Sequence, residues 1–346
     1  MLPNEDLRSP ILTIAIPTYN RVTHLTRLIE FLRRELNELD GEVSIVVADN
    51  ASTDGTSNMI TKLSLDCPYL TIVTHKVNLG MDGNFKFCAE MAKGAFFWII
   101  GDDDLPVSGA IKALLRMLKC EQPDLVLLNS YWSRDIGIQE KNILPITKLL
   151  YTRMQRDAFG RRMHVWATYL SGIVVRRTSF LKNTREISSL SGTNLTQLSW
   201  VLERLRDGKV FIHVGNTCVL ATAGNTGGYP VIEVFGDCFP RIVSKYLSQN
   251  SAQRFLAKQI VFRMMLNYLP QLLWGFRCKR LGNFKSENVA HVLMRQVGSH
   301  PIMVPILILI GTAPYPIARL MMVITYVFAR AIAMVDRIRL LLPLRY

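Results

Sequence analysis

The chain has 346 residues, of which 49% are hydrophobic and 20% are charged. This composition excludes a disordered protein, and the length allows about two ordinary domains with a sizeable core. The formal net charge of +14 is uneven, because residues 241–346 carry 15 Lys and Arg against 2 Asp and Glu. A uniformly basic nucleic-acid-binding protein would spread this charge along the chain, so no nucleic-acid partner is expected.

The cysteine pattern and the N-terminus favour an intracellular protein. The six cysteines include no CxxC pair, which argues against a structural zinc site and favours reduced, mostly buried thiols. The N-terminus is acidic and leads into a six-residue apolar run, whereas a signal peptide needs a basic start and a longer apolar stretch. The main domain is therefore expected to face the cytoplasm.

The first 130 residues alternate between strand and helix patterns. Apolar runs of strand length lie at residues 11–16, 43–48, 69–74, 95–100 and 125–128. Helical patterns lie between them at residues 22–32, 59–63, 84–93 and 108–119. Near-continuous apolar strands separated by helices are typical of a parallel sheet buried on both faces. The pattern predicts an α/β fold with a Rossmann-like, mostly parallel sheet flanked by helices.

Residues 131–240 are less regular. Strand patterns lie at residues 172–175 and 210–214, a helix pattern lies between them at 195–205, and residues 222–229 have the composition of a loop. We interpret this stretch as the second half of the same domain. The expected organisation is a domain of residues 1–240, with halves 1–130 and 131–240, followed by a helical region at 241–346.

The region 241–346 combines positive charge with long uncharged runs. Residues 302–318 contain no charge, and residues 320–329 follow the single Arg319. A membrane-spanning helix needs roughly 20 apolar residues, but prolines interrupt the first run and the second is too short alone. The pattern favours a helical tail that lies in a membrane interface beside anionic lipid, and the uncharged runs favour lipid over nucleic acid. A buried core helix, an oligomer contact and a true span are the alternatives.

The first predicted strand runs into the sequence IPTYNR at residues 16–21. In an open parallel sheet, ligands bind at the carboxyl ends of strands, and a helix N-terminus there offers free N–H groups to an anion. Taken alone, the segment is also consistent with an ordinary strand that ends at proline and a helix capped by Thr or Asn.

The second predicted strand ends in DNASTDGT at residues 49–56. Two carboxylates and several small polar residues at one strand end exceed what packing requires. Asp49 is placed to accept a hydrogen bond from a nucleotide base, because a carboxylate is a directional acceptor. Asp54 is better explained as the cap of the following helix, reached through Gly55.

The third predicted strand is followed by NLGMDGN at residues 78–84. Its glycines permit close approach of the backbone to a ligand. Capping of the next helix by Asn84 explains the segment equally well, so both interpretations stand at this point.

The fourth predicted strand ends in GDDDLP at residues 101–106. Three consecutive carboxylates at a buried strand end are electrostatically costly unless a cation neutralises them. Mg²⁺ and Mn²⁺ bind through one or two carboxylates together with substrate phosphates. An exposed acidic turn would explain Asp104 but not three acids in a row. The segment therefore predicts a divalent metal site suited to a diphosphate leaving group.

Together, IPTYNR, DNASTDGT, NLGMDGN and GDDDLP, in this order and spacing, resemble the family 2 nucleotide-sugar glycosyltransferases of the GT-A fold. The resemblance covers residues 10–130 and extends loosely to 225. The GDDD form, with SGIVVRR at residues 171–177, is most similar to the bacterial abequosyltransferase-like subgroup, which builds surface polysaccharide.

The resemblance implies roles for residues of all four motifs. It places the nucleoside on Pro17, Thr18, Tyr19, Asp49 and Asn50, with Asp49 on the base, and it makes Asp102–Asp104 the DXD motif that binds ribose and Mn²⁺ or Mg²⁺. In the D-x-D-D register of the family, the ion contacts Asp103 or Asp104. The full expected set for the nucleotide sugar is Pro17, Thr18, Tyr19, Asn20, Arg21, Asp49, Asn50, Asn78, Gly80, Asn84 and Asp102; the metal set is Asp102, Asp103 and Asp104.

The catalytic base departs from the family pattern. Many relatives carry Glu-Asp before an Arg-Leu pair, and counting back from Arg204 places Gln197 and Leu198 at those positions. Neither side chain acts as a general base. The replacement candidates are Asp104, Asp157 and Glu186, with His164 and Glu203 as further ionisable residues in this half.

The expected activity is metal-dependent, inverting transfer of a hexosyl or deoxyhexosyl group from a nucleoside-diphosphate sugar. The acceptor would be a saccharide linked to polyprenyl diphosphate, at the cytoplasmic face of the inner membrane, in O-antigen or capsule synthesis. One alternative is a catalytically inert, nucleotide-sugar- or membrane-binding member of an assembly complex. Another is a nucleotidyltransferase, but residues 16–24 contain neither the Gly nor the Lys of its triphosphate loop.

Overall fold

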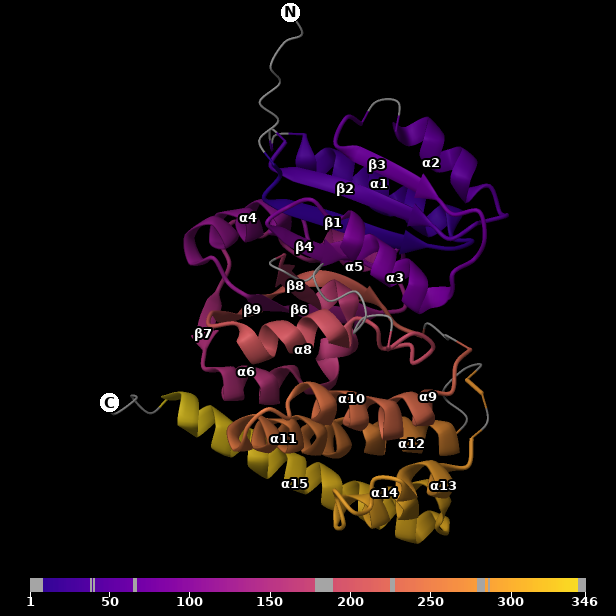
Figure 1. The fold of residues 1–346 in the computed structure, drawn as a ribbon, viewed down its shortest axis with the longest axis vertical. Coiled ribbons are helices and arrows are strands. Elements are labelled where there is room, and N and C mark those ends of the chain that lie inside the picture. The colour runs from indigo at the N-terminus through magenta and orange to yellow at the C-terminus, as the bar shows by residue number, and fades with distance from the viewer. Residues whose placement is uncertain are drawn as a thin grey trace, which may run out of the picture. The chain divides into compact units, whose positions relative to one another are not determined.

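The computed structural model describes residues 9–37, 39, 41–64, 67–177, 189–224, 228–278, 284–285 and 287–341. The chain divides into two compact units, Met1–Ala223 and Gly224–Tyr346 (Figure 1). The division precedes the expected boundary at residue 240, because residues after 230 are already helical and join the second unit. Phe235, for example, packs edge-on against Tyr268 with ring centroids 4.9 Å apart.

The described residues of the first unit form a sheet of nine strands. They are β1 (Leu12–Thr18), β2 (Val43–Asp49), β3 (Leu70–Thr74), β4 (Phe96–Ile99), β5 (Leu105–Pro106), β6 (Leu125–Ser133), β7 (Tyr151–Met154), β8 (Ile173–Arg176) and β9 (Phe211–Thr222). The order is β3-β2-β1-β4-β8-β6-β9-β5, and β7 pairs with β9. Strands β1 to β4 are parallel, as are β6 and β9, while β8 runs antiparallel between β4 and β6. The predicted α/β class with a mostly parallel sheet is confirmed.

Helices flank this sheet (Figure 1). They are α1 (Val22–Leu36), α2 (Thr56–Ser64), α3 (Gly80–Met91), α4 (Ala110–Glu121), α5 (Ile136–Asn142), α6 (Arg156–Met163) and α8 (Leu198–Asp207), with 3₁₀ turns η1 (His164–Thr168) and η2 (Leu170–Gly172). Helix α3 begins at Gly80, four residues before the expected start. The reason is local, because the Asn78 side chain accepts a hydrogen bond from the Gly80 N–H at 2.8 Å and starts the helix there.

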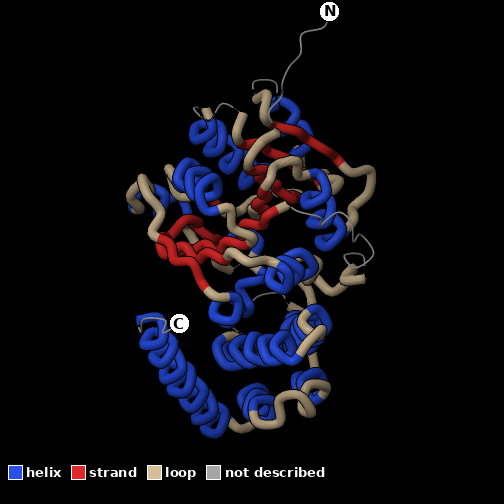
Figure 2. The backbone as a smooth tube through the Cα atoms, turned by 60° about the vertical axis from the view of Figure 1, so that its left-hand side comes forward, coloured by secondary structure: helices blue, strands red, loops and turns tan. Residues whose placement is uncertain are grey.

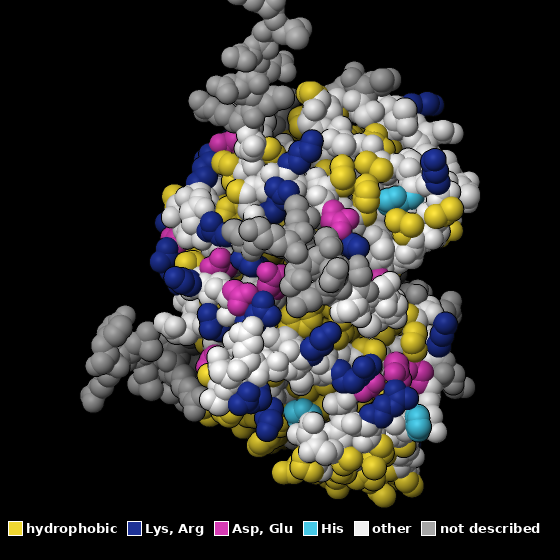
Figure 3. Space-filling model, in the orientation of Figure 1, with side chains coloured by type: hydrophobic (Ala, Val, Ile, Leu, Met, Phe, Trp, Pro, Cys, Tyr) yellow, Lys and Arg dark blue, Asp and Glu magenta, His cyan; other side chains and the backbone are white. Residues whose placement is uncertain are grey.

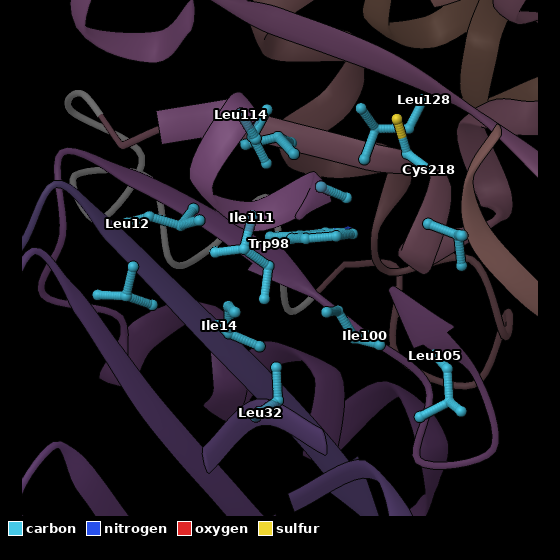
Figure 4. Packing of buried hydrophobic residues seen from close by; sticks show 14 of the residues in the cluster. Leu12, Ile14, Leu32, Trp98, Ile100, Leu105, Ile111, Leu114, Leu128 and Cys218 are labelled. Atoms are coloured by element: carbon cyan, nitrogen blue, oxygen red, sulfur yellow. The ribbon is translucent and has the colours of Figure 1, made fainter. Parts of the chain in front are cut away.

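The core of the first unit lies between β1, β4 and the helices that cover them (Figure 4). Ile14 of β1 and Trp98 of β4 are fully buried, and Ile111 and Leu114 of α4 lie over them. The Trp98 indole N–H donates to the Ser171 carbonyl at 2.9 Å, so its one polar group is satisfied. Each such large side chain contributes about 1.5–3 kcal/mol of burial, and this rigid centre fixes the strand ends that follow it.

The second unit is helical (Figure 2). Its helices are α9 (Val231–Glu233), the π-helical turn η4 (Val234–Cys238), α10 (Phe239–Tyr246), α11 (Ser251–Asn267), α12 (Leu269–Arg277), α13 (Val289–Met294), α14 (Met303–Thr312) and α15 (Tyr315–Leu341). The expected helical C-terminal region is confirmed. In the sequence, residues 320–329 look too short to span a membrane, but they belong to a longer helix. Within α15, Tyr315–Val335 is long and apolar enough to cross a bilayer, with a mean hydropathy of 1.7.

Candidate active site

The four sequence motifs lie together at the carboxyl ends of the parallel strands. Strands β1 and β2 are parallel and in register, so that Thr18 pairs with Asp49 at their carboxyl ends. Strand β4 runs parallel to β1 on its other side and leads directly into Gly101. Segments far apart in the sequence are therefore brought together by the sheet, as the motif spacing predicts.

Asp102, Asp103 and Asp104 are all buried, with 9%, 7% and 5% of the residue surface exposed. Thr18 donates its hydroxyl to Asp102 Oδ2 at 2.7 Å. Arg21 reaches Asp103 Oδ2 at 3.8 Å. Burial, together with the neighbouring carboxylates, raises the pKa of Asp102 to about 7, although the Thr18 hydroxyl and Arg21 oppose the shift. Thr18 and Arg21 of the first motif thus contact the acidic residues of the fourth motif.

Asp104 is held by hydrogen-bond donors from the second half of the unit. Its Oδ2 accepts from the Tyr169 hydroxyl and its Oδ1 from the Thr222 N–H, both at 2.9 Å. Burial raises its pKa to about 6, against the hydrogen bonds from Ser171, Thr222 and Tyr169. With both oxygens engaged, Asp104 ties the acidic segment to η2 and β9. Tyr169 and Thr222 were not identified from the sequence, because they lie 65 and 118 residues from Asp104.

The chemistry of this segment suits a divalent cation. Carboxylate oxygens are the ligands that Mg²⁺ and Mn²⁺ prefer, and these three carboxylates are consecutive in the chain and belong to buried residues. The pKa values of Asp102 and Asp104 are raised mainly by burial, and repulsion from the Asp103 carboxylate adds to the shift. Because Asp104 serves the fold with both oxygens, Asp102 and Asp103 are the residues best placed to hold an ion.

The loop after β2 is locked to the loop after β1. Asn20 accepts from the Thr53 N–H at 2.8 Å, and its own N–H donates to the Ser52 hydroxyl at 2.8 Å. Asp49 is fully buried and accepts from the Ser52 N–H at 3.1 Å. Beside this locked pair of loops, Tyr19 leaves 45% of its surface exposed, next to the buried Pro17. The two loops therefore form a hydrogen-bonded polar surface, and the Tyr19 ring beside it is accessible to solvent.

Asp54 has the capping role that the sequence favours. Its Oδ1 accepts from the Thr56 N–H at 3.0 Å at the start of α2. Its Oδ2 also accepts from the Val22 N–H at 3.1 Å, at the start of α1. One carboxylate therefore holds two helix N-termini, where negative charge is favourable.

Asn50 connects the second and third motifs. Its amide nitrogen donates to Asn78 Oδ1 at 2.9 Å, and its carbonyl oxygen accepts from the Leu79 N–H at 2.8 Å. Gly80, with φ of 71°, adopts the left-handed conformation that glycine accepts without strain. Asn50 and Asn78 thus fix the loop backbone beside the site.

Asn84 does not have the capping role that the sequence allows. It lies inside α3 with 3% of its surface exposed, so it does not cap this helix. Its amide nitrogen donates to the Ala48 carbonyl at 3.0 Å, and its oxygen lies 3.1 Å from His75 Nε2. These contacts bind α3 to the end of β2.

Asp82 is a structural anchor that the sequence did not reveal. It is 7% exposed, and its carboxylate accepts from the N–H groups of Asn194 at 2.9 Å and Thr196 at 3.1 Å. Burial raises its pKa, against these backbone hydrogen bonds. Asp82 therefore holds the loop that leads into α8. Its role was not evident from the sequence, because its partners lie more than 100 residues away in the chain.

The N-terminus of α8 lies where the family's base is expected. Gln197 is 4% exposed and donates to the Thr168 carbonyl at 3.0 Å, while Leu198 is fully buried. The Gln197 carbonyl oxygen is buried, and within the described chain it accepts no hydrogen bond. It lines a small cavity with apolar residues that include Phe97 and Trp200. This end of α8 is apolar, in contrast to the acidic segment.

The alternative base candidates do not gather at one place. Asp157 is exposed in the first turn of α6, and Glu203 pairs with Arg204 at 3.1 Å on α8. His164 is partly buried and accepts from the Val165 N–H. Glu186 lies outside the described residues.

Comparison with known proteins identifies relatives of this arrangement. Residues 13–181 match the sequence profile of glycosyl transferase family 2. The abequosyltransferase RfbV of Salmonella typhimurium is 33% identical over 118 residues, which is 34% of this chain and 35% of that protein. The GalNAc(5)-diNAcBac-PP-undecaprenol beta-1,3-glucosyltransferase of Campylobacter jejuni is 28% identical over 108 residues, 31% of this chain and 34% of that protein. The match thus spans about a third of these relatives.

A solved structure resembles nearly the whole chain. Residues 1–349 of TarS from S. aureus, in complex with UDP, superpose with a TM-score of 0.59 and 17% identity, covering 91% of this chain and 88% of that one. At this identity the likeness establishes the fold alone.

Proposed function

Since the chain belongs to glycosyl transferase family 2 through residues 13–181, we propose that it transfers a sugar from a nucleoside-diphosphate donor to a saccharide acceptor. One observation carries the proposal. Thr18 and Arg21, at the end of β1, contact the buried carboxylates of Asp102 and Asp103, at the end of β4. Ligands of open α/β sheets bind at this edge, and a diphosphate with its cation is a ligand that needs such a charge arrangement.

The nucleoside would lie along the ends of β1 and β2. Asp49 would accept a hydrogen bond from the base in place of the one that its Oδ2 accepts from the Ser57 hydroxyl. The exposed ring of Tyr19 offers a face for stacking. Asn20, Asn50, Asn78 and Asn84 support this surface through loop contacts. The name of the Salmonella relative, an abequosyltransferase, and the UDP complex of TarS support a nucleotide-sugar donor.

Asp102 and Asp103 would hold a divalent cation, which when bound would neutralise charge on the departing diphosphate. Around it, Thr18 orients the Asp102 carboxylate and Arg21 adds positive charge beside Asp103. Asp104 keeps this segment in place through Tyr169 and Thr222.

The transfer step forms one bond and breaks one. The acceptor oxygen bonds to the anomeric carbon, the bond from that carbon to the diphosphate oxygen breaks, and the hydroxyl proton passes to a base. Attack opposite the leaving group inverts the configuration. Gln197 and Leu198 cannot take up the proton, so Asp104, Asp157 and Glu186 remain the candidates for its acceptor.

Donor binding tests the proposal first. Purified protein is screened by thermal shift against UDP-, GDP-, CDP- and dTDP-sugars with Mn²⁺, because a ligand that binds only the folded state raises Tm. We expect one nucleotide class to stabilise the protein, and Asp103→Asn to remove the metal-dependent part of the shift. Asp207→Asn, in an exposed pair with Arg206, is the matched control. Absence of any donor shift contradicts the proposal.

A turnover assay distinguishes an active sugar transferase from a catalytically inert binding protein. Release of nucleoside diphosphate from the stabilising donor, with a mixed extract of polyprenyl-linked saccharides as acceptor, is expected for the wild type. A protein that binds the donor but releases no nucleoside diphosphate, with or without acceptor, would support the inert assembly member instead.

The second unit supports a further part of the proposal, attachment to a membrane. The two α15 residues that are buried in the described part of the helix are small or polar, with Ala318 fully buried and Thr325 3% exposed. The outward side carries bulky apolar residues, including Leu320, Val323 and Val327, which are 55%, 52% and 60% exposed. A helix on a water-soluble core has the opposite polarity, whereas small residues at helix contacts are typical of proteins in lipid.

Apolar side chains gather over α14 and α15, along the lower edge of the view in Figure 3. Arg319 and Arg330 lie exposed on the same helix, which suits anionic headgroups. A position at the cytoplasmic face of the inner membrane would bring the chain to a polyprenyl-diphosphate-linked acceptor. The Campylobacter relative is named for an acceptor of this kind.

Vesicle sedimentation tests membrane attachment. The wild type is expected to bind vesicles of phosphatidylethanolamine and phosphatidylglycerol more strongly than vesicles of phosphatidylcholine alone. The double variant Leu320→Glu with Val327→Glu should bind at least about tenfold less, given the burial energy of two such side chains. Leu144→Glu, at an 85% exposed apolar position in the first unit, is the control. A wild type that stays soluble at low salt with vesicles present overturns this part.

A further inference from the structure

Three aromatic side chains form an open cluster in the first unit. The Trp132 ring, at the end of β6, lies 4.8 Å from the Tyr169 ring and 6.2 Å from the Trp166 ring, centroid to centroid. Trp132 is 44% exposed and Trp166 is 41% exposed, whereas Trp98 and Trp200 of the same unit are 0% and 2% exposed. Solvent exposure of two neighbouring indole rings is costly, which points to a ligand rather than to the core.

The cluster borders the acidic segment on one side. The hydroxyl of Tyr169 donates to Asp104 at 2.9 Å. Trp132 pairs in the sheet with Ala221, the residue before Thr222, whose N–H also binds Asp104. The Tyr169 ring is fixed in place over Gly172, where an added Cβ would lie 2.7 Å from Cδ1 of the ring.

On the other side the cluster borders the start of α8. Thr168, which follows Trp166 by two residues and precedes Tyr169, accepts a hydrogen bond from Gln197 at 3.0 Å. The rings thus lie between the carboxylates proposed to hold the diphosphate and the helix end where relatives of this family carry their base. An acceptor hydroxyl has to enter between these two elements.

We propose that Trp132, Trp166 and Tyr169 form the acceptor subsite, on which the ring of an acceptor saccharide stacks. A pyranose presents an apolar face of C–H groups and a polar rim of hydroxyls, so an aromatic surface with polar neighbours matches both. The subsite would hold the acceptor beside Gln197 and Leu198, neither of which carries an ionisable group. This inference rests on the proposed sugar transfer.

Direct binding tests the subsite without the donor. A bacterial glycan array and tryptophan fluorescence titration with the glycans it selects are applied to the wild type and to Trp132→Leu, Trp166→Leu and Tyr131→Leu. Tyr131 is the matched control, because it is 46% exposed and, as the neighbour of Trp132 on β6, lies on the opposite face of the strand. We expect each tryptophan variant to lose about tenfold or more in affinity, Trp132→Phe to retain most of it, and Tyr131→Leu to match the wild type.

The kinetic readout separates this inference from the proposed function. Both tryptophan variants should raise KM for the acceptor while the Tm shift given by the donor stays that of the wild type. A wild type that binds no array glycan, or tryptophan variants that bind as the wild type does, overturns the subsite. A wild type that binds glycans but shows no Tm shift with any nucleotide sugar leaves the subsite supported and contradicts the donor proposal instead.

Discussion

On the side of the site formed by β1, β2 and β4, polar side chains from separate loops bind one another directly, as Thr18 binds Asp102 and Asn50 binds Asn78. On the side formed by β6, η1 and α8, aromatic rings lie open and the helix begins with a buried leucine. A charged nucleotide needs fixed polar geometry, and parallel strand ends supply it. A saccharide acceptor is recognised by shape and apolar faces, which different chains can build in different ways.

The substitution with the largest expected effect lies on the proposed donor side. Asp103→Asn keeps the size of the side chain but removes one charge from the acidic segment, so donor binding should lose its metal dependence and transfer should fall about 10²–10³-fold, as for removal of a charge-stabilising group. Nucleoside diphosphate release measures the loss.

The same assay on Asp207→Asn should give wild-type rates. If Asp103→Asn retains more than about a tenth of the activity, which corresponds to under 1.4 kcal/mol of barrier, the ion does not depend on this carboxylate.

A second substitution asks whether Asp104 joins the two sides or acts in the chemistry. Asp104→Ala leaves the Thr222 N–H and the Tyr169 hydroxyl without their acceptor, which costs about 1–3 kcal/mol for each buried group. We expect Asp104→Ala to have a lower Tm than the wild type and to bind the same class of nucleotide sugar. Asp104→Asn, which can still accept from Thr222, should recover most of the stability. Equal Tm values for the alanine variant and the wild type would contradict the anchoring role.

The difference between the two sides also explains how much the sequence could predict. Strands β1 to β4 and the convergence of their four motifs were predicted, because apolar runs and parallel order place strand ends together. The two-residue β5 and the four-residue β7 were missed, since such short strands carry no clear pattern. The partners of Asp82 and Asp104 come from segments 65 to 118 residues away, and no local pattern reports such contacts.

Asp82 offers a smaller and more specific test of how the two sides communicate. The N–H groups of Asn194 and Thr196 donate to different oxygens of Asp82, so Asp82→Asn removes the acceptor of one of them and the charge that strengthens the other bond. We expect hydrogen exchange in residues 192–198 to accelerate and acceptor KM to rise about two- to tenfold, in line with about 0.5–1.5 kcal/mol for a hydrogen bond.

Donor affinity is the internal control for this variant, because the hydrogen bonds described for the Asp82 side chain go to Asn194 and Thr196, which are not assigned to the nucleotide. A change in donor affinity without a change in exchange at residues 192–198 would show that Asp82 acts on the donor loops and not on α8.

A last pair of substitutions distinguishes the aromatic residues of the two sides. Tyr19 and Trp132 are exposed to nearly the same degree, at 45% and 44%, so neither substitution should alter stability appreciably. Tyr19→Ala is expected to weaken donor binding by about 1 kcal/mol, the typical contribution of a stacked ring, and to leave acceptor KM unchanged. Trp132→Leu is expected to raise the acceptor KM and to leave donor binding unchanged. Each variant is therefore the control for the other in one set of initial-rate measurements with both substrates varied. If both variants change the same KM, the two rings contact one substrate, and the division of the site into a polar donor side and an aromatic acceptor side is wrong.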